Sequence, residues 1–166
     1  GSVRELCSAV SRECSKYGYE PVMLTDQLCC QAKEAGSFLA SIAKTHCKSG
    51  KKLAYIAGGE TIVNITGHGK GGRNQEIALS AAEGIKGMSN AAVFSIGSDG
   101  TDGPTDAAGG YSDGDTAGIL KNKGIDIFEV LKNNDAYNAL KLTEGLIITG
   151  PTGTNVNDVS VLLISD

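Results

Sequence analysis

The fold is organised around residues 95–116, which have the sequence SIGSDGTDGPTDAAGGYSDGDT. The apolar segment AAVFSI at 91–96 leads into this stretch and is expected to form a buried strand. Five aspartates follow it, separated largely by glycine and threonine: Asp99, Asp102, Asp106, Asp113 and Asp115. Carboxylates this close repel one another unless a cation, a basic side chain or backbone N–H groups hold them. The stretch is therefore either a solvated, turn-rich loop or a ligand-binding loop.

Glycine is the outlier in the composition, at 23 of 166 residues, roughly twice the usual share of ~7%. Fourteen of these glycines lie between Gly58 and Gly114, so the excess is local. It marks loops with special backbone geometry, and it also allows the backbone to approach a ligand closely. Two further polar, glycine-rich loops, at 67–76 and 149–158, favour a functional role for the aspartate-rich loop.

Length and charge limit the class of protein. A chain of 166 residues is expected to form one domain with a real core. Its net charge of −4 and its lack of tryptophan argue against nucleic acid as a partner. No apolar run reaches the ~18 residues of a membrane span, and we expect neither a membrane segment nor a signal peptide. The five cysteines are odd in number and form no CxxC pair, which favours reduced thiols in a cytoplasmic protein.

Hydrophobic periodicity predicts helices alternating with apolar strands. Helical patterns cover residues 3–17, about 27–48 with Asp26 as N-cap, and a segment opened by 67–76. Short helices are expected within 116–123 and 125–140, with breaks at Gly124 and at Asn133-Asn134. Strands are expected at 19–24, 51–57, 61–66, 91–96, 146–148 and 159–164, with 51–57 and 61–66 joined as a hairpin around Gly58-Gly59. The pattern predicts one layered α/β domain over residues 1–166, with a mixed sheet flanked by helices. The polar, glycine-rich loops should gather at one edge of that sheet.

The loop at 67–76 contains Gly67-x-Gly69-x-x-Gly72, which matches the dinucleotide-binding fingerprint. The preceding segment alternates polar and apolar residues, however, whereas the first strand of a Rossmann fold is buried on both faces. An anion site explains the loop better, with free N–H groups at a helix start and the cations Lys70 and Arg73. Alternatively, Arg73 pairs with Glu60 or an aspartate, and Lys70 is solvated.

Four motifs occur in the same order as in a known family: GGETIVNITGHGKGGRNQE (58–76), SIGSDGTDGPTDAAGGYSDGDT (95–116), NDAY (134–137) and TGPTGTNVNDVSVLLI (149–164). Together they resemble the C-terminal, MOFRL-type domain of the glycerate 2-kinase family, whose members have often been labelled hydroxypyruvate reductases. Ile62 departs from the pattern, since relatives often have threonine there.

The resemblance implies phosphorylation of D-glycerate to 2-phosphoglycerate, or in some relatives to the 3-phosphate, with ATP and Mg²⁺ as cofactors. It also implies an active site in a cleft between this domain and a larger N-terminal domain. That larger domain is not part of this sequence, so the chain is expected to form one wall of the site and to be inactive alone.

The resemblance also implies roles for individual residues. Arg73 would bind the glycerate carboxylate or a transferring phosphate, with Glu60, Lys70, Gly71, Gly72 and Asn74 in the same substrate and phosphate site. Asp99, Asp102 and Asp106 would hold Mg²⁺ or orient the hydroxyl, and Asp99 and Asp102 would take part in catalysis with Arg73. Thr152, Gly153, Thr154 and Asn155 would contact phosphate. Asp113 and Asp115 either join the site or cap the helix at Thr116, and Asp158 either binds a cation or orders its turn.

Two other functions are compatible with these residues. The first is a stand-alone module that binds a small anionic metabolite or a divalent cation without chemistry. The second is an NAD(P)H-dependent hydroxypyruvate reductase, which the weak fingerprint match disfavours. Activity that appears only when the rest of the enzyme is present would favour the kinase, and absence of NAD(P)H binding would end the reductase hypothesis.

Overall fold

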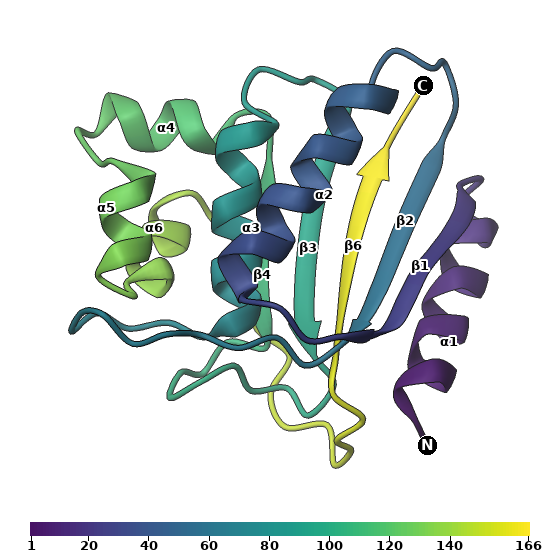
Figure 1. Ribbon diagram of the computed structural model, residues 1–166, viewed down its shortest axis with the longest axis horizontal. Helices are drawn as coiled ribbons and strands as arrows, with labels where there is room; N and C mark the ends of the chain where they lie inside the picture. The colour runs from purple at the N-terminus through teal and green to yellow at the C-terminus, as the bar shows by residue number, and fades with distance from the viewer.

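The computed structural model describes all of residues 1–166 and shows a six-stranded mixed sheet with helices on both faces (Figure 1). The helices are α1 (Val3–Lys16), α2 (Ala32–His46), α3 (Arg73–Gly84), α4 (Thr116–Asn122), α5 (Ile127–Lys132) and α6 (Ala136–Leu142). The strands are β1 (Glu20–Leu28), β2 (Leu53–Gly59), β3 (Ala91–Gly97), β4 (Gly109–Asp113), β5 (Leu146–Ile147) and β6 (Asp158–Ile164). The predicted layered α/β class with a mixed sheet is confirmed.

The strand order is β1-β2-β6-β3-β4-β5, and only the pair β1–β2 is parallel. β6 lies between β2 and β3 and runs antiparallel to both. Asp158, at the start of β6, is therefore opposite Gly59 at the end of β2 and Gly97 at the end of β3. This register brings the segments that follow β2 and β3 and the loop before β6 to one edge of the sheet, as predicted.

Helices cover the two faces of the sheet with separate apolar clusters. On one face α2 and α3 pack over the central strands around Leu39, Ile77 and Leu162. On the other face α1 packs over β2 and β6, where Cys7 is buried against Ile56. A third cluster joins α3 to the helices α4, α5 and α6. All five cysteines are free thiols, and none of the helices is long and apolar enough to cross a membrane.

The predicted hairpin around Gly58-Gly59 is wrong. Strand β2 is central, with β1 on one side and β6 on the other, so neither of its edges is free for residues 61–66. That segment, which we call the strap (residues 61–66), instead runs across the edge of the sheet with a single bridge from Ile62 to Gln31. The dinucleotide fingerprint thus lacks the strand that should precede its first glycine.

Two further boundaries differ from prediction. Strand β1 continues to Leu28 and α2 begins only at Ala32, so Asp26 caps no helix; its carboxylate accepts a hydrogen bond from Arg4 Nε at 2.9 Å. Strand β4 was not predicted, because its first residues are Gly109 and Gly110. A Cβ at Gly109 would lie 1.8 Å from the Ser95 carbonyl oxygen, so this strand requires glycine to approach β3.

Candidate functional site

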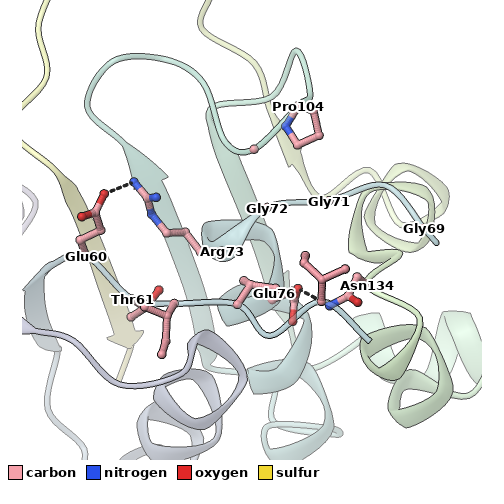
Figure 2. A pocket seen from close by; sticks show the side chains of 13 residues that line it. Glu60, Thr61, Gly69, Gly71, Gly72, Arg73, Glu76, Pro104 and Asn134 are labelled. Atoms are coloured by element: carbon pink, nitrogen blue, oxygen red, sulfur yellow. Dashed lines mark hydrogen bonds and ion pairs between the residues drawn. The ribbon is translucent and has the colours of Figure 1, made fainter. Parts of the chain in front are cut away.

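A cleft of about 440 Å³ opens where the strap passes the N-terminus of α3 (Figure 2). Its lining comes from the segment after β2, the start of α3, the aspartate-rich loop and the turn before α6. The lining residues are Glu60, Thr61, Ile62, Val63, Ile65, Gly69, Gly71, Gly72, Arg73, Glu76, Gly103, Pro104 and Asn134. The predicted substrate residues Glu60, Gly71, Gly72 and Arg73 thus line one cavity.

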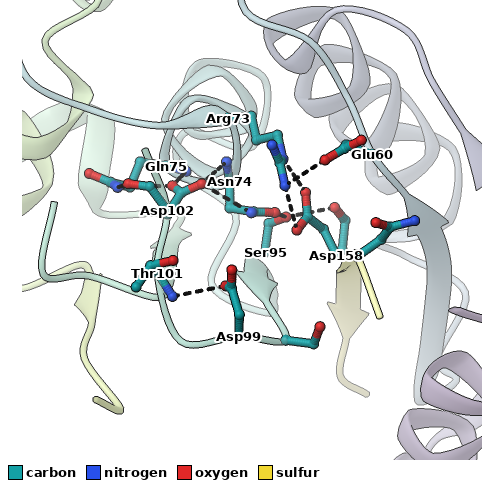
Figure 3. A network of polar contacts seen from close by, with 12 residues as sticks. Glu60, Arg73, Asn74, Gln75, Ser95, Asp99, Thr101, Asp102 and Asp158 are labelled. Atoms are coloured by element: carbon teal, nitrogen blue, oxygen red, sulfur yellow. Dashed lines mark hydrogen bonds and ion pairs between the residues drawn. The ribbon is translucent and has the colours of Figure 1, made fainter. Parts of the chain in front are cut away.

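Arg73, the first residue of α3, is held by two carboxylates (Figure 3). Its Nε and Nη2 donate to the two oxygens of Asp158, at 2.5 and 3.2 Å, and Nη2 also lies 3.1 Å from Glu60 Oε1. The predicted pairing with Glu60 or an aspartate is therefore confirmed, and the aspartate is Asp158. This hydrogen bonding raises the pKa of Arg73. Nε and Nη2 are thus both engaged by carboxylates, while the two N–H groups of Nη1 have no partner within the chain.

Asp102 caps α3 from the aspartate-rich loop. It is only 2% exposed, and its carboxylate accepts from the backbone N–H groups of Asn74 and Gln75 at 3.0 and 2.9 Å. The side-chain amides of the same two residues donate to it at 3.1 and 2.9 Å. Burial raises the pKa of Asp102, while these four donors lower it. The expectation that N–H groups at this helix start are free is wrong for Asn74 and Gln75.

Beneath Arg73, a buried polar network ties α3 to the sheet (Figure 3). Ser95 Oγ donates to Asn74 Oδ1 at 2.6 Å and is hydrogen-bonded to Ser160 Oγ at 2.7 Å. Ser95 and Ser160 are directly opposite on β3 and β6. Asn74, predicted as a substrate residue, thus has both ends of its amide engaged within the protein. Ser95 and Ser160 were not predicted, although each is the one polar residue in the otherwise apolar segments 91–96 and 159–164.

The three aspartates predicted as Mg²⁺ ligands lie in different surroundings. Asp99 Oδ1 accepts from the Thr101 N–H at 3.0 Å, and its Oδ2 has no partner within the chain. Asp102 is the buried cap, and exposed Asp106 accepts from the Tyr137 hydroxyl at 2.8 Å. No group of three or more His, Cys, Asp and Glu side chains is gathered in the chain.

Mg²⁺ is usually held by one or two carboxylates together with water and substrate phosphates. Asp99 fits such a site, because it is partly exposed and keeps one oxygen unpaired. It also lies near Asp158: a Cβ at Gly97 would be 3.2 Å from Asp99 Oδ1 and 3.3 Å from Asp158 Oδ1. Asp102 does not fit in this conformation, since both of its oxygens are occupied.

The loop 149–157 packs against the residues that follow β3. The Thr152 hydroxyl donates to the Ser98 carbonyl and the Thr152 N–H to the Asp99 carbonyl, at 2.5 and 3.3 Å. The Val156 N–H donates to Ser98 Oγ at 2.7 Å. The structure thus brings Thr152 beside Asp99, and the predicted phosphate residues Thr152, Gly153, Thr154 and Asn155 are all exposed. The Thr152 hydroxyl itself holds the loop in place.

The loop before α3 is fastened to the segment 132–137. The side-chain oxygen of Asn134 accepts from the N–H groups of Thr66 and Gly67, at 2.7 and 2.9 Å, and its amide donates to the Asn64 carbonyl at 3.1 Å. A Cβ at Gly67 would lie 2.3 Å from the Asn133 Cα, so glycine here serves contact between two backbones. Lys70 Nζ lies 4.0 Å from the centre of the Tyr137 ring, a cation–π contact at the protein surface.

The predicted capping of α4 at Thr116 is wrong for both aspartates, and the turn before the helix is instead ordered by Asp113. Its Oδ1 accepts from the Asp115 N–H at 2.9 Å and lies 3.5 Å from Thr116 Oγ1. Asp115 is the N-cap residue of α4, but its own side chain makes no capping hydrogen bond. Neither residue lines the cleft.

Comparison with known proteins agrees with this architecture. Residues 53–158 match the model of the MOFRL family. Over 99% of its length the chain is 50% identical to D-glycerate 2-kinase of Thermotoga maritima, of which it covers 40%. Over 96% of its length it is 45% identical to glycerate 2-kinase of Pyrococcus horikoshii, of which it covers 37%.

A solved structure is similar as well. The crystal structure of glycerate kinase from Thermotoga maritima aligns with a TM-score of 0.94 and 50% identity, over 99% of this chain and 41% of that one. The chain thus spans about two fifths of the length of these relatives. On this evidence it belongs to the MOFRL family.

Proposed function

We propose that this chain is part of a glycerate kinase, which transfers a phosphoryl group from ATP to D-glycerate to give 2-phosphoglycerate. The observation that carries the proposal is the geometry of Arg73. Asp158 and Glu60 fix its guanidinium at the cleft, and the two N–H groups of Nη1 have no partner within the chain. These charge-assisted donors can bind an oxygen of a carboxylate or a phosphate. Relatives that are 45% and 50% identical are named glycerate 2-kinases.

Phosphoryl transfer depends mainly on positioning the reactants and neutralising charge. In this proposal Arg73 holds the glycerate carboxylate or the transferring phosphate, while Asp158 and Glu60 orient Arg73. The exposed residues Gly153 to Asn155 follow Thr152, which contacts Asp99, and they can contact phosphate. Mg²⁺, with Asp99 as its ligand in this chain, would neutralise the charge on the phosphate oxygens.

The cleft has an open side, and the chain spans only about two fifths of its relatives. We therefore propose that the remaining part of the enzyme, a larger N-terminal domain, completes the site. The test is ADP formation with D-glycerate, ATP and Mg²⁺, measured for this chain alone and for the full-length protein. Turnover only in the full-length protein is expected, and absence of turnover in both would contradict the kinase assignment.

A further inference from the structure

Two buried polar side chains on the cleft wall lack the partners that burial demands. Thr61 is 3% exposed, and its hydroxyl has no hydrogen-bond partner. Glu76 is 4% exposed, and its carboxylate receives one hydrogen bond within the chain, from Asn134 Nδ2 to Oε2 at 3.3 Å. Buried polar groups are normally hydrogen-bonded, so two under-partnered neighbours in one cavity point to a ligand.

These side chains share the cleft with Arg73 (Figure 2). Figure 2 shows Glu76 between Thr61 and Asn134. Arg73 and Glu76 are three residues apart on α3, a spacing that places Cβ atoms about 5–6 Å from each other on one helix face. One small molecule can therefore contact both side chains.

We propose that Glu76 and Thr61 form a hydroxyl-binding subsite beside Arg73, which makes the cleft specific for small hydroxy acids over plain carboxylates. The ligand hydroxyl donates to Glu76 Oε1, and its oxygen accepts from the Thr61 hydroxyl. The inference rests on the proposed function, in which Arg73 holds the carboxylate. An acid without the hydroxyl leaves both groups unpaired. The cost of leaving buried polar groups unpaired makes the cleft bind such an acid much more weakly.

The surroundings of Glu76 favour a neutral hydroxyl over a cation as its partner. The positive charge of Lys33 acts on Glu76 and repels a cation. Burial raises the pKa of Glu76, and the charge of Asp102 raises it further. The hydrogen bond from Asn134 and the charge of Lys33 lower it. The carboxyl group is thus short of hydrogen-bond donors, and a ligand hydroxyl supplies one.

The test compares D-glycerate with propionate, which has a carboxylate but no hydroxyl. Dissociation constants are measured by ligand-observed NMR titration of the 166-residue chain. We expect glycerate to bind at least about tenfold more tightly than propionate. Thr61→Val and Glu76→Gln should each reduce this ratio several-fold by weakening glycerate binding alone. Thr61→Ser keeps the hydroxyl and should keep the ratio.

Equal affinity for the two acids in the unchanged chain, or a ratio that Thr61→Val and Glu76→Gln leave intact, would overturn the subsite. So would a lack of binding by the unchanged chain. Circular dichroism of each variant checks that it is folded. The kinase assignment fails by a different result, the absence of ADP formation by the full-length protein, so the two failures are distinguishable.

Discussion

At the scale of single residues, Asp102 positions Arg73 without touching it. Asp102 accepts the N–H groups of the two residues that follow Arg73, and this fixes the first turn of α3. Gly72 is necessary for this contact, because a Cβ there would lie 2.5 Å from the Asp102 Cγ. The aspartate-rich loop thus shapes the site through the buried Asp102. Among the predicted metal ligands, only Asp99 has an unpaired carboxylate oxygen near the loop 149–157.

Replacing Asp102 tests this capping role. Asp102→Asn keeps the shape of the side chain but turns one acceptor oxygen into a donor that faces the donors of Asn74 and Gln75. We expect the free energy of unfolding to fall by about 2–3 kcal/mol, since hydrogen bonds to a buried charge are lost. Urea denaturation measures the change. Asp106→Asn, at an exposed position, is the control and should stay within about 0.5 kcal/mol of the unchanged chain; equal effects of both substitutions would refute the capping role.

At the scale of elements, the strap closes one side of the cleft although it belongs to no sheet. The side chain of Asn134 holds the strap in place. It is hydrogen-bonded to Asn64 and Thr66 of the strap and to Gly67, which follows it. It also donates to Glu76 of α3. Asn134 has a φ of 54°, a conformation that asparagine tolerates better than most residues. One residue of the NDAY motif therefore links the strap, α3 and the turn before α6.

Asn134→Ala should free the strap while leaving the sheet folded. The amide hydrogens of Thr66 and Gly67 lose their acceptor, so we expect them to exchange with solvent faster by roughly tenfold or more, as local opening becomes easier. Hydrogen exchange followed by NMR measures this. Asn138→Ala, on the exposed side of α6, is the matched control. Unchanged exchange at both amides in Asn134→Ala would show that the strap is held by other contacts.

The same elements show what the sequence could predict. The periodicity of apolar residues identified α1, α3 and the central strands, because those segments bury one side or both. It missed β4, where glycines replace the apolar residues, and it misplaced 61–66 as a strand, because alternation says nothing about which strand edges are free. At the site, the pairing of Arg73 with Glu60 and an aspartate was predictable. The identity of the aspartate that pairs with Arg73, Asp158, and the contact between Ser95 and Ser160 both depend on how the strands align. That alignment cannot be determined from a single sequence.

At the scale of the whole molecule, the sheet topology assembles the site. An antiparallel β6 between β2 and β3 brings Glu60, Asp99 and Asp158 to the same edge, although Glu60 and Asp158 are far apart in sequence. The chain corresponds to about two fifths of its relatives, so this edge is proposed to face the remainder of the enzyme. In the proposed function, Arg73 at this edge binds the glycerate carboxylate or the transferring phosphate.

The most direct test of this account is kcat/KM for D-glycerate in the full-length protein and in its Arg73→Lys variant. Lysine keeps the positive charge beside Asp158 but loses the guanidinium group, which binds Asp158 through two nitrogens and still offers Nη1 to a ligand. We predict a loss of about 100-fold or more in kcat/KM, with a thermal unfolding midpoint close to that of the unchanged protein. A variant with near-normal turnover of D-glycerate would contradict the role of Arg73 and the site built around it.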